Sequence, residues 1–195
     1  MRKKLLLQLL LLGGMTTASP VLLAAVASGE TLGGTCTACH GYNGSSVGVI
    51  PSIAGNTEDY FAETMEAFKS GERQSTVMGR VAKGYSSEEI QRMAKFFAAQ
   101  KPVPMKQKFD SSKAALGAKI HKKSCNKCHE DGGRSGSEDP VLAGQSMLYL
   151  KYSMADFKNK AREGDKKMAK KVKSVLSEHG KEGLEALIQY YGSIK

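Results

Sequence analysis

Several features that would assign a chain to common classes are missing from these 195 residues. There is no G-x-G-x-x-G fingerprint, which excludes a dinucleotide-binding domain of that kind. No succession of alternating apolar and polar residues predicts strands, so a βαβ fold is excluded as well. Beyond the N-terminal leader, no apolar run approaches the roughly 20 residues of a membrane span. Cysteine and histidine are scarce, with four of each, so any pattern that they form is informative.

The first 27 residues are typical of a signal peptide. Three basic residues precede an apolar run over residues 5–12, and Ala25-Val26-Ala27 has the A-x-A pattern of a cleavage site. The alternative is a retained membrane anchor, but glycine and proline within residues 13–20 interrupt the apolar run too early for a span. The sequence therefore predicts export to the periplasm, cleavage near Ala27 and no membrane span afterwards.

All four cysteines and two of the four histidines belong to two copies of Cys-x-x-Cys-His, 89 residues apart. The two copies consist of Cys36, Cys39 and His40, and of Cys125, Cys128 and His129. Residues three apart on a helical turn share a face, so both thiols of one copy can bond to the two vinyl groups of one porphyrin. The adjacent histidine then becomes the proximal ligand of the iron. The motifs predict two covalently bound haem c groups.

Other uses of such cysteines fit less well. Two Cys-x-x-Cys pairs can form a zinc site, but here nearly ninety residues separate them and each is followed directly by histidine. A thioredoxin-like redox motif needs a βαβ context, and structural disulfides leave both histidines unexplained. Haem attachment explains every residue of both motifs.

The repeat extends beyond these motifs with the same offset of 89 residues. Pro51–Gly55 has the same Pro-x-hydrophobic-Ala-Gly pattern as Pro140–Gly144. Further matched pairs are Tyr60 and Tyr149, Met65 and Met154, Phe68 and Phe157 and, after one inserted residue, Met78 and Met168. A repeat of this length indicates two homologous domains rather than a solenoid.

The predicted domain organisation follows from the repeat. A first haem domain covers residues 28–100, a linker 101–109 contains two prolines that stop a helix, and a second haem domain covers 110–195. Domains of this size have small cores, and a large apolar haem compensates. The fold is predicted to be all-α, with one covalently attached haem inside each of two tandem domains. Apolar spacing and capping residues predict helices over Thr57–Phe68, from Ser86 to Phe97, over Ser112–Lys123 and over Ser146–Phe157.

The sixth ligand of each iron is expected to be a methionine that recurs in both repeats. Two pairs recur, and Met65 and Met154 fall inside predicted helices where methionine usually fills a core. Met78 and Met168 fall between predicted helices, 38 and 39 residues beyond the proximal histidines, where a loop can bring a thioether to the opposite haem face. We therefore favour Met78 and Met168, with Met65 and Met154 as the alternative.

The remaining histidines, His121 and His179, have no counterparts in the other repeat and are expected at the surface. No fifth cysteine is left for thiolate ligation, so both irons are predicted to be six-coordinate with His and Met ligands. A ligating histidine usually donates its other ring N–H to a carbonyl. The carbonyls of Pro51 and Pro140, each 11 residues after a haem histidine, are the candidates.

Charge is distributed unevenly between the two predicted domains. Residues 28–100 carry 6 basic and 8 acidic side chains (net −2), whereas residues 101–195 carry 20 and 11 (net +9). Export and haem attachment argue against a nucleic-acid partner. A solvated lysine-rich surface and a docking face for an acidic redox partner both remain open.

These motifs resemble the di-haem class I cytochromes c of the c-four type and, more narrowly, the cytochrome subunits of flavocytochrome c sulfide dehydrogenase. The residues that carry the resemblance are Phe68–Glu72, Met78–Ser86, Leu142–Gln145, Met154–Phe157 and Lys166–Ala169. The resemblance implies that Met78 and Met168 are the axial ligands. It also implies a separate partner subunit that contains FAD and oxidises sulfide.

On this interpretation the chain is a non-catalytic electron-transfer subunit. It accepts electrons from the FAD subunit and passes them to a soluble cytochrome or another acceptor. One alternative is a free di-haem carrier that delivers electrons to a terminal oxidase or another periplasmic enzyme. Another is a di-haem catalyst such as a peroxidase or thiosulfate dehydrogenase, although such enzymes need an open or unusually ligated iron.

Overall fold

The structure is a computed structural model that describes residues 26–134, 139–162 and 166–195. Nearly all of the predicted signal peptide lies outside these residues. The described residues form helices and connecting segments without a strand, apart from one isolated antiparallel bridge between Arg73 and Arg162. The prediction of an all-α fold is confirmed. The helices are α1 (Gly29–Gly33), η1 (Gly34–Cys36), α2 (Thr37–His40), η2 (Tyr42–Gly44), α3 (Glu58–Ser70), α4 (Met78–Ala82), α5 (Ser87–Ala98), α6 (Ser111–Ser124), η3 (Asp131–Gly133), α7 (Met147–Lys158) and α8 (Lys166–Ser193).

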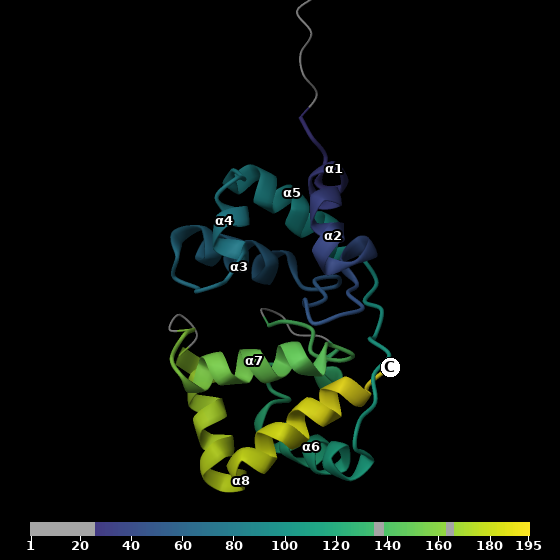
Figure 1. The fold of residues 1–195 in the computed structure, drawn as a ribbon, viewed down its shortest axis with the longest axis vertical. Coiled ribbons are helices and arrows are strands. Elements are labelled where there is room, and N and C mark those ends of the chain that lie inside the picture. Colours follow the sequence, from purple (N-terminus) through teal and green to yellow (C-terminus); the bar gives the residue numbers. More distant parts are fainter. Residues whose placement is uncertain (1–25, 135–138, 163–165) are drawn as a thin grey trace, which may run out of the picture.

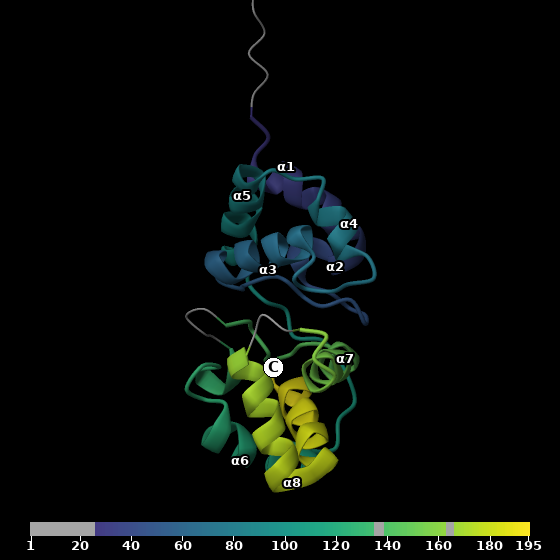
Figure 2. The same ribbon diagram turned by 90° about the vertical axis from the view of Figure 1, so that its left-hand side faces the viewer.

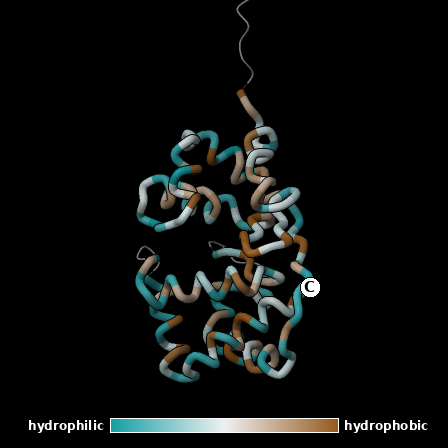
Figure 3. Tube along the Cα trace, in the orientation of Figure 1, coloured by the Kyte–Doolittle hydropathy of each residue, from teal (hydrophilic) through white to brown (hydrophobic). Residues whose placement is uncertain are grey.

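Two helical bundles are stacked end to end (Figure 1). Helices α1–α5 form one bundle and α6–α8 the other, and residues 101–110, which form no helix, run between them. Polar and apolar residues alternate along the helices, as expected for helices with one face turned inward (Figure 3). No helix among the described residues is long and apolar enough to cross a membrane.

The first bundle is organised around α3 and α5. Thr57 caps α3 by accepting the N–H of Tyr60, and Gly71 ends the helix in the left-handed conformation. A capping box of Ser86 and Glu89 opens α5. Both starting points were predicted from the sequence. The buried core consists of Phe61, Ala62, Met65, Ala82, Ile90, Met93, Ala94 and Phe97.

The second bundle is built on α8, against which α6 and α7 pack. Asp110 caps α6 and Ser146 caps α7. Gly180 has a φ of 64° and a ψ of −162°, which breaks α8 and folds its second half back, as Figure 2 shows. The core includes Ile120, Leu150, Met154, Phe157, Val172, Val175, Leu187 and Tyr191.

In each bundle a glycine brings the first helix against the backbone of the last. A Cβ at Gly29 would overlap the carbonyl of Arg92 in α5, and a Cβ at Gly117 would overlap the carbonyl of Ala186 in α8. The first helix is short in the first bundle (5 residues) and long in the second (14 residues). This crossing fixes the segment that leads directly into each Cys-x-x-Cys-His motif.

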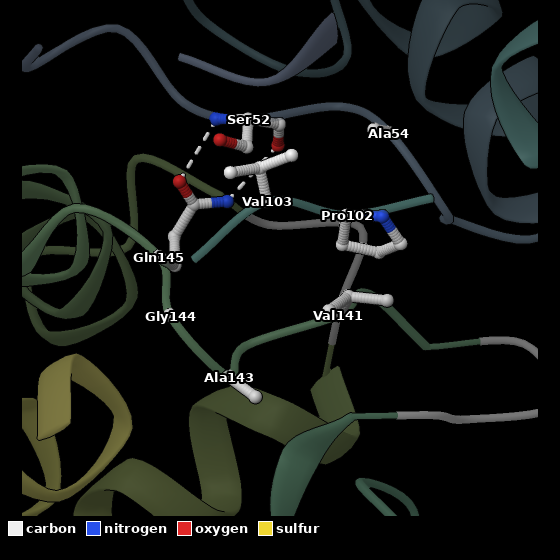
Figure 4. A pocket seen from close by; sticks show the side chains of 8 residues that line it. All are labelled: Ser52, Ala54, Pro102, Val103, Val141, Ala143, Gly144 and Gln145. Atoms are coloured by element: carbon white, nitrogen blue, oxygen red, sulfur yellow. Dashed lines mark hydrogen bonds between the residues drawn. The ribbon is translucent and has the colours of Figure 1, made fainter. Parts of the chain in front are cut away.

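The two bundles meet through reciprocal hydrogen bonds. Asn56 Oδ1 accepts the backbone N–H of Val141 (2.9 Å), and Gln145 Oε1 accepts the backbone N–H of Ser52 (2.9 Å). Asn56 and Gln145 are 89 residues apart, as are Ser52 and Val141. Gln145 Nε2 also donates to the carbonyl of Ser52 (3.0 Å; Figure 4). The repeats therefore face each other about an approximate two-fold axis.

The glycine crossing can be tested with two alanine substitutions in the same helical segment. We expect Gly29→Ala to lower the free energy of unfolding by about 2 kcal/mol, because the added methyl group must displace the backbone of α5. Gly34→Ala meets no atom within 4 Å and should leave stability unchanged or slightly raised. Urea unfolding of the haem-loaded protein, followed by far-UV circular dichroism, measures both. Equal losses would show that overlap with Arg92 is not the cause.

Candidate functional site

The first Cys-x-x-Cys-His motif lies on one nearly continuous helical segment. Cys36 ends η1, and Cys39 and His40 belong to α2, which follows without a gap. Cys36 is half-buried and Cys39 exposed, whereas His40 is buried. Gly41, with a φ of 79°, ends the segment directly after the histidine. Two thiols and one imidazole are thus gathered on a single turn of chain.

The His40 ring is held by a carbonyl. Its Nδ1 lies 2.7 Å from the carbonyl oxygen of Pro51, which confirms the predicted partner. With Nδ1 donating, Nε2 keeps a lone pair for a metal. Burial lowers the pKa of His40 and the bond to Pro51 partly offsets this, so the imidazole is neutral at neutral pH, as a metal ligand must be. The corresponding role of Pro140 stays a prediction.

The second motif repeats this arrangement at the end of α6. Cys125 is the C-cap of the helix, and its carbonyl accepts the N–H groups of Cys128 and His129 (3.1 and 3.0 Å). His129 is buried, like its counterpart. All four cysteines are free, and burial raises the pKa of the Cys36 and Cys125 thiols. No group of three or more His, Cys, Asp or Glu side chains with metal-binding geometry occurs among the described residues, so they give the zinc alternative no support.

The methionines differ from expectation in one respect. Met78 is the first residue of α4 and Met168 the third of α8, so the prediction that both lie in loops is wrong. Met78 opens the short helix α4 and Met168 lies in the first turn of the long helix α8, and apolar periodicity had indicated neither helix start. Both side chains are partly buried against the core of their own repeat. Met65 and Met154 are buried within α3 and α7, which confirms their expected place in the cores.

His121 is the residue that sequence reasoning misplaced. It was expected at the surface, but only 2% of it is exposed. With its Nε2 protonated, the ring donates to Asn126 Oδ1 (3.2 Å) and its Nδ1 accepts the hydroxyl of Tyr191 (2.9 Å). A signal was present, because the residue 89 positions earlier is the apolar Leu32. A polar residue at a core position of one repeat indicates a partner that the other repeat lacks.

That partner is Tyr191, which corresponds to Phe97 in the first repeat. The carbonyl of Phe97 accepts the N–H of Gly55, and the carbonyl of Tyr191 accepts the N–H of Gly144, the matching glycine. Burial raises the pKa of the Tyr191 phenol well above its ordinary value, so it remains a hydrogen-bond donor. Behind its haem motif the second repeat has a hydrogen-bonded pair where the first repeat is apolar.

An arginine and tyrosine cluster lies where the repeats meet. Arg73 and Arg162, 89 residues apart, form the isolated bridge. Arg73 donates to Tyr149 of the other repeat (3.4 Å), and each guanidinium lies over a phenylalanine of its own repeat, at 4.6 and 4.2 Å from the ring centroid. Burial raises the pKa of the Tyr60 phenol, whereas the positive charges of both arginines lower it. The pKa of Tyr60 therefore lies below its ordinary value. Neither arginine has an ion pair with a described aspartate or glutamate.

These side chains fit haem c. Each repeat supplies two free thiols and a buried histidine on one turn, and a methionine against an apolar core. The half-buried guanidinium groups between the repeats suit a group that carries carboxylates. Each repeat therefore has the thiols and the histidine that covalent attachment of a haem requires, and the sixth ligand stays a prediction.

Family models match both repeats. The model described as cytochrome c matches residues 26–101, and the model described as cytochrome c oxidase, cbb3-type, subunit III matches residues 112–190. These matches imply covalent haem c with iron, and two haems are consistent with the similarity to cytochrome c4.

Individual relatives resemble different shares of the chain. The cytochrome subunit of sulfide dehydrogenase from Chlorobaculum tepidum is 45% identical over 43% of this chain and 81% of its own length. Cytochrome c4 from Pseudomonas aeruginosa is 29% identical over 95% of this chain and 98% of its own. The crystal structure of reduced cytochrome c4 from Pseudomonas stutzeri superposes with a TM-score of 0.74, at 24% identity, over 86% of this chain and 97% of that one.

The burial of His121 makes the stability of the folded protein depend on pH. Burial lowers the pKa of His121 and its bond to Asn126 offsets only part of this. Below about pH 6.5, the His121 imidazole binds a proton more readily in the unfolded chain than in the folded protein. The free energy of unfolding present at neutral pH is therefore lost on acidification. We expect the haem-loaded protein to lose more free energy of unfolding between about pH 7 and about pH 5 than the His121→Leu/Tyr191→Phe variant. Denaturant unfolding at each pH measures this.

The two replacements copy the first repeat, so they keep the site apolar and leave no polar group unpaired. His179→Gln is the control, because it removes a histidine and leaves the buried one in place. It should retain the pH dependence of the unmodified protein. The same dependence in the Leu/Phe variant would rule out His121 as its source.

Proposed function

Because this chain belongs to the class I c-type cytochromes, as a di-haem electron carrier similar to cytochrome c4, we propose that it is the electron-accepting subunit of a flavocytochrome c sulfide dehydrogenase. It then takes electrons from a partner subunit that contains FAD and passes them to a soluble cytochrome or another external acceptor. The 45% identity to a sulfide dehydrogenase cytochrome subunit carries this proposal. That identity covers 43% of the chain, and the subunit role is proposed for the whole protein.

The proposed haem-binding residues act in two sets. Cys36, Cys39, Cys125 and Cys128 attach the two haems, and the axial pairs are His40 with Met78 and His129 with Met168. When bound, each haem supplies an iron that takes up and releases one electron. The bond from Nδ1 of His40 to the Pro51 carbonyl keeps the imidazole neutral and oriented. A methionine as sixth ligand leaves no open position for substrate, which favours electron transfer over catalysis.

The chain contributes fixed geometry and local electrostatics to this function. The reciprocal bonds of Asn56 and Gln145 hold the two repeats against each other, so the distance between the two sites does not depend on a mobile linker. Arg73 and Arg162 place positive charge between the sites, where it stabilises carboxylates. Export to the periplasm, which the leader predicts, is part of the same proposal.

A second candidate function is that of a free di-haem carrier. A cytochrome c4 matches 95% of the chain, and nothing in that likeness requires a flavin partner. The two functions differ in whether a flavoprotein accompanies the chain. The presence or absence of a flavoprotein subunit in the native protein therefore decides between the two functions.

Purification of the native protein under mild conditions, with spectra before and after addition of sulfide, separates the two. Co-purification of a flavoprotein, with flavin bleaching and haem reduction by sulfide, is the expected result. A di-haem protein without flavin, reduced by other donors and not by sulfide, would identify a free carrier.

Single methionine substitutions test the axial ligands. We expect Met78→Ala and Met168→Ala each to convert one haem to a high-spin or differently ligated form and to lower its potential, because the thioether is lost from the iron. Absorption spectra and redox titration measure both effects.

Met65→Ala and Met154→Ala are the matched controls. They should destabilise the core by about 2–5 kcal/mol and leave both haem spectra unchanged. The reverse pattern, with altered spectra only in the controls, would make Met65 and Met154 the ligands.

A further inference from the structure

The surfaces next to the two haem-attachment motifs differ in chemistry. Close in sequence to the first motif and its methionine, the exposed side chains include the apolar Val47, Val77 and Val81, exposed by 90%, 51% and 38%, and two basic residues, Arg80 and Lys83. Next to the second motif and its methionine they are lysines. Residues 122–131 and 166–173 together contain eight lysines and two acidic side chains.

The difference affects matching positions of the repeat. Met78 and Met168 match at an offset of 90 residues, and at this offset Lys167 matches Val77 and Lys171 matches Val81. All four side chains are exposed. At these two positions the surface is therefore apolar in one repeat and cationic in the other, which a uniformly solvated lysine-rich surface does not explain. Two further matched pairs, Arg80 with Lys170 and Lys83 with Lys173, are basic in both repeats.

The two segments belong to neighbouring parts of the second repeat. Helix α6, which ends at the second motif, packs along α8 (Figure 2), and Lys123 Nζ bonds to Glu178 Oε2 across them at 2.7 Å. Cys125, Met168 and Ala169 pack against the same core cluster, which places the first turns of α8 near the motif. We call five exposed lysines of these two segments the basic rim; it consists of Lys122, Lys127, Lys167, Lys170 and Lys171.

We propose that the basic rim is the docking surface for an acidic protein electron acceptor, so that electrons leave the molecule through the second repeat. The inference rests on the proposed electron-transfer function. In that function the donor is a bound subunit, whereas the acceptor must arrive and depart in each turnover. Positive charge around the exit site accelerates such encounters with an acidic partner without making the complex long-lived. One electron moves per encounter, as the second haem is oxidised and the acceptor's metal centre is reduced.

Two charge-neutralising variants with equal charge change test the proposal. The rim variant is Lys127→Gln/Lys167→Gln/Lys171→Gln. The control variant is Lys106→Gln/Lys108→Gln/Lys113→Gln, which removes three exposed lysines from the linker and the first turn of α6, at the opposite end of that helix from the motif. Both are produced as the full haem-loaded protein, and their haem potentials are measured so that a changed driving force is not mistaken for changed docking.

Stopped-flow oxidation of the reduced protein then uses three probes: an acidic blue-copper protein of the plastocyanin type, a basic mitochondrial-type cytochrome c, and ferricyanide. With the acidic protein at low ionic strength, the rim variant should react about 10-fold more slowly than the unmodified protein, and the control variant less than about 2-fold more slowly. Added salt should remove the difference. The basic cytochrome should show no slowing with the rim variant.

Other outcomes would overturn the proposal in distinguishable ways. Equal slowing of both variants would show a general effect of net charge. Loss of binding to phosphatidylglycerol vesicles in the rim variant, at unchanged oxidation rates, would make the rim a membrane-binding surface. If ferricyanide and both proteins failed to oxidise the unmodified protein, the electron-transfer function itself would be wrong.

Discussion

The close backbone contact between the first and last helix of each repeat is the constraint on which the remainder depends. At Gly29 and Gly117 the absent side chain lets a helix lie directly against a carbonyl of its partner. A short stretch of chain later, each first helix leads into a Cys-x-x-Cys-His motif, so the crossing sets where the thiols and the histidine lie. Domains of this size have little apolar surface to bury, and direct backbone packing positions the motif without a large core.

Local signals in the sequence predicted most of the fold. Thr57, Gly71 and the pair Ser86 and Glu89 mark helix ends through their own hydrogen bonds and backbone conformations, so they can be recognised without the tertiary structure. The offset of 89 residues also related α3 to α7, whereas no helix was predicted over residues 166–193, where the long helix α8 lies. The bond between His40 and Pro51 was predictable because metal-bound histidines need a second partner.

What the sequence did not indicate depends on contacts between distant segments. The burial of His121 follows from a tyrosine 70 residues away, and the helical start at Met78 follows from packing in the first bundle. The reciprocal bonds across the interface were invisible for the same reason, since Asn56 and Gln145 are ordinary polar residues until the repeats are brought together.

The approximate two-fold axis has a consequence for how such a protein can change. In a homodimer, every interface substitution occurs twice, so a harmful contact is doubled and both sites must remain alike. Here both halves of the interface belong to one chain, and each position can be altered by itself. The corresponding positions of the two repeats already carry different residues, Asn56 and Gln145 at one and Ser52 and Val141 at the other. The hydrogen bonds between the repeats are nevertheless reciprocal. Two repeats within one chain thus keep the geometry of a symmetric pair, while each half can change without the other.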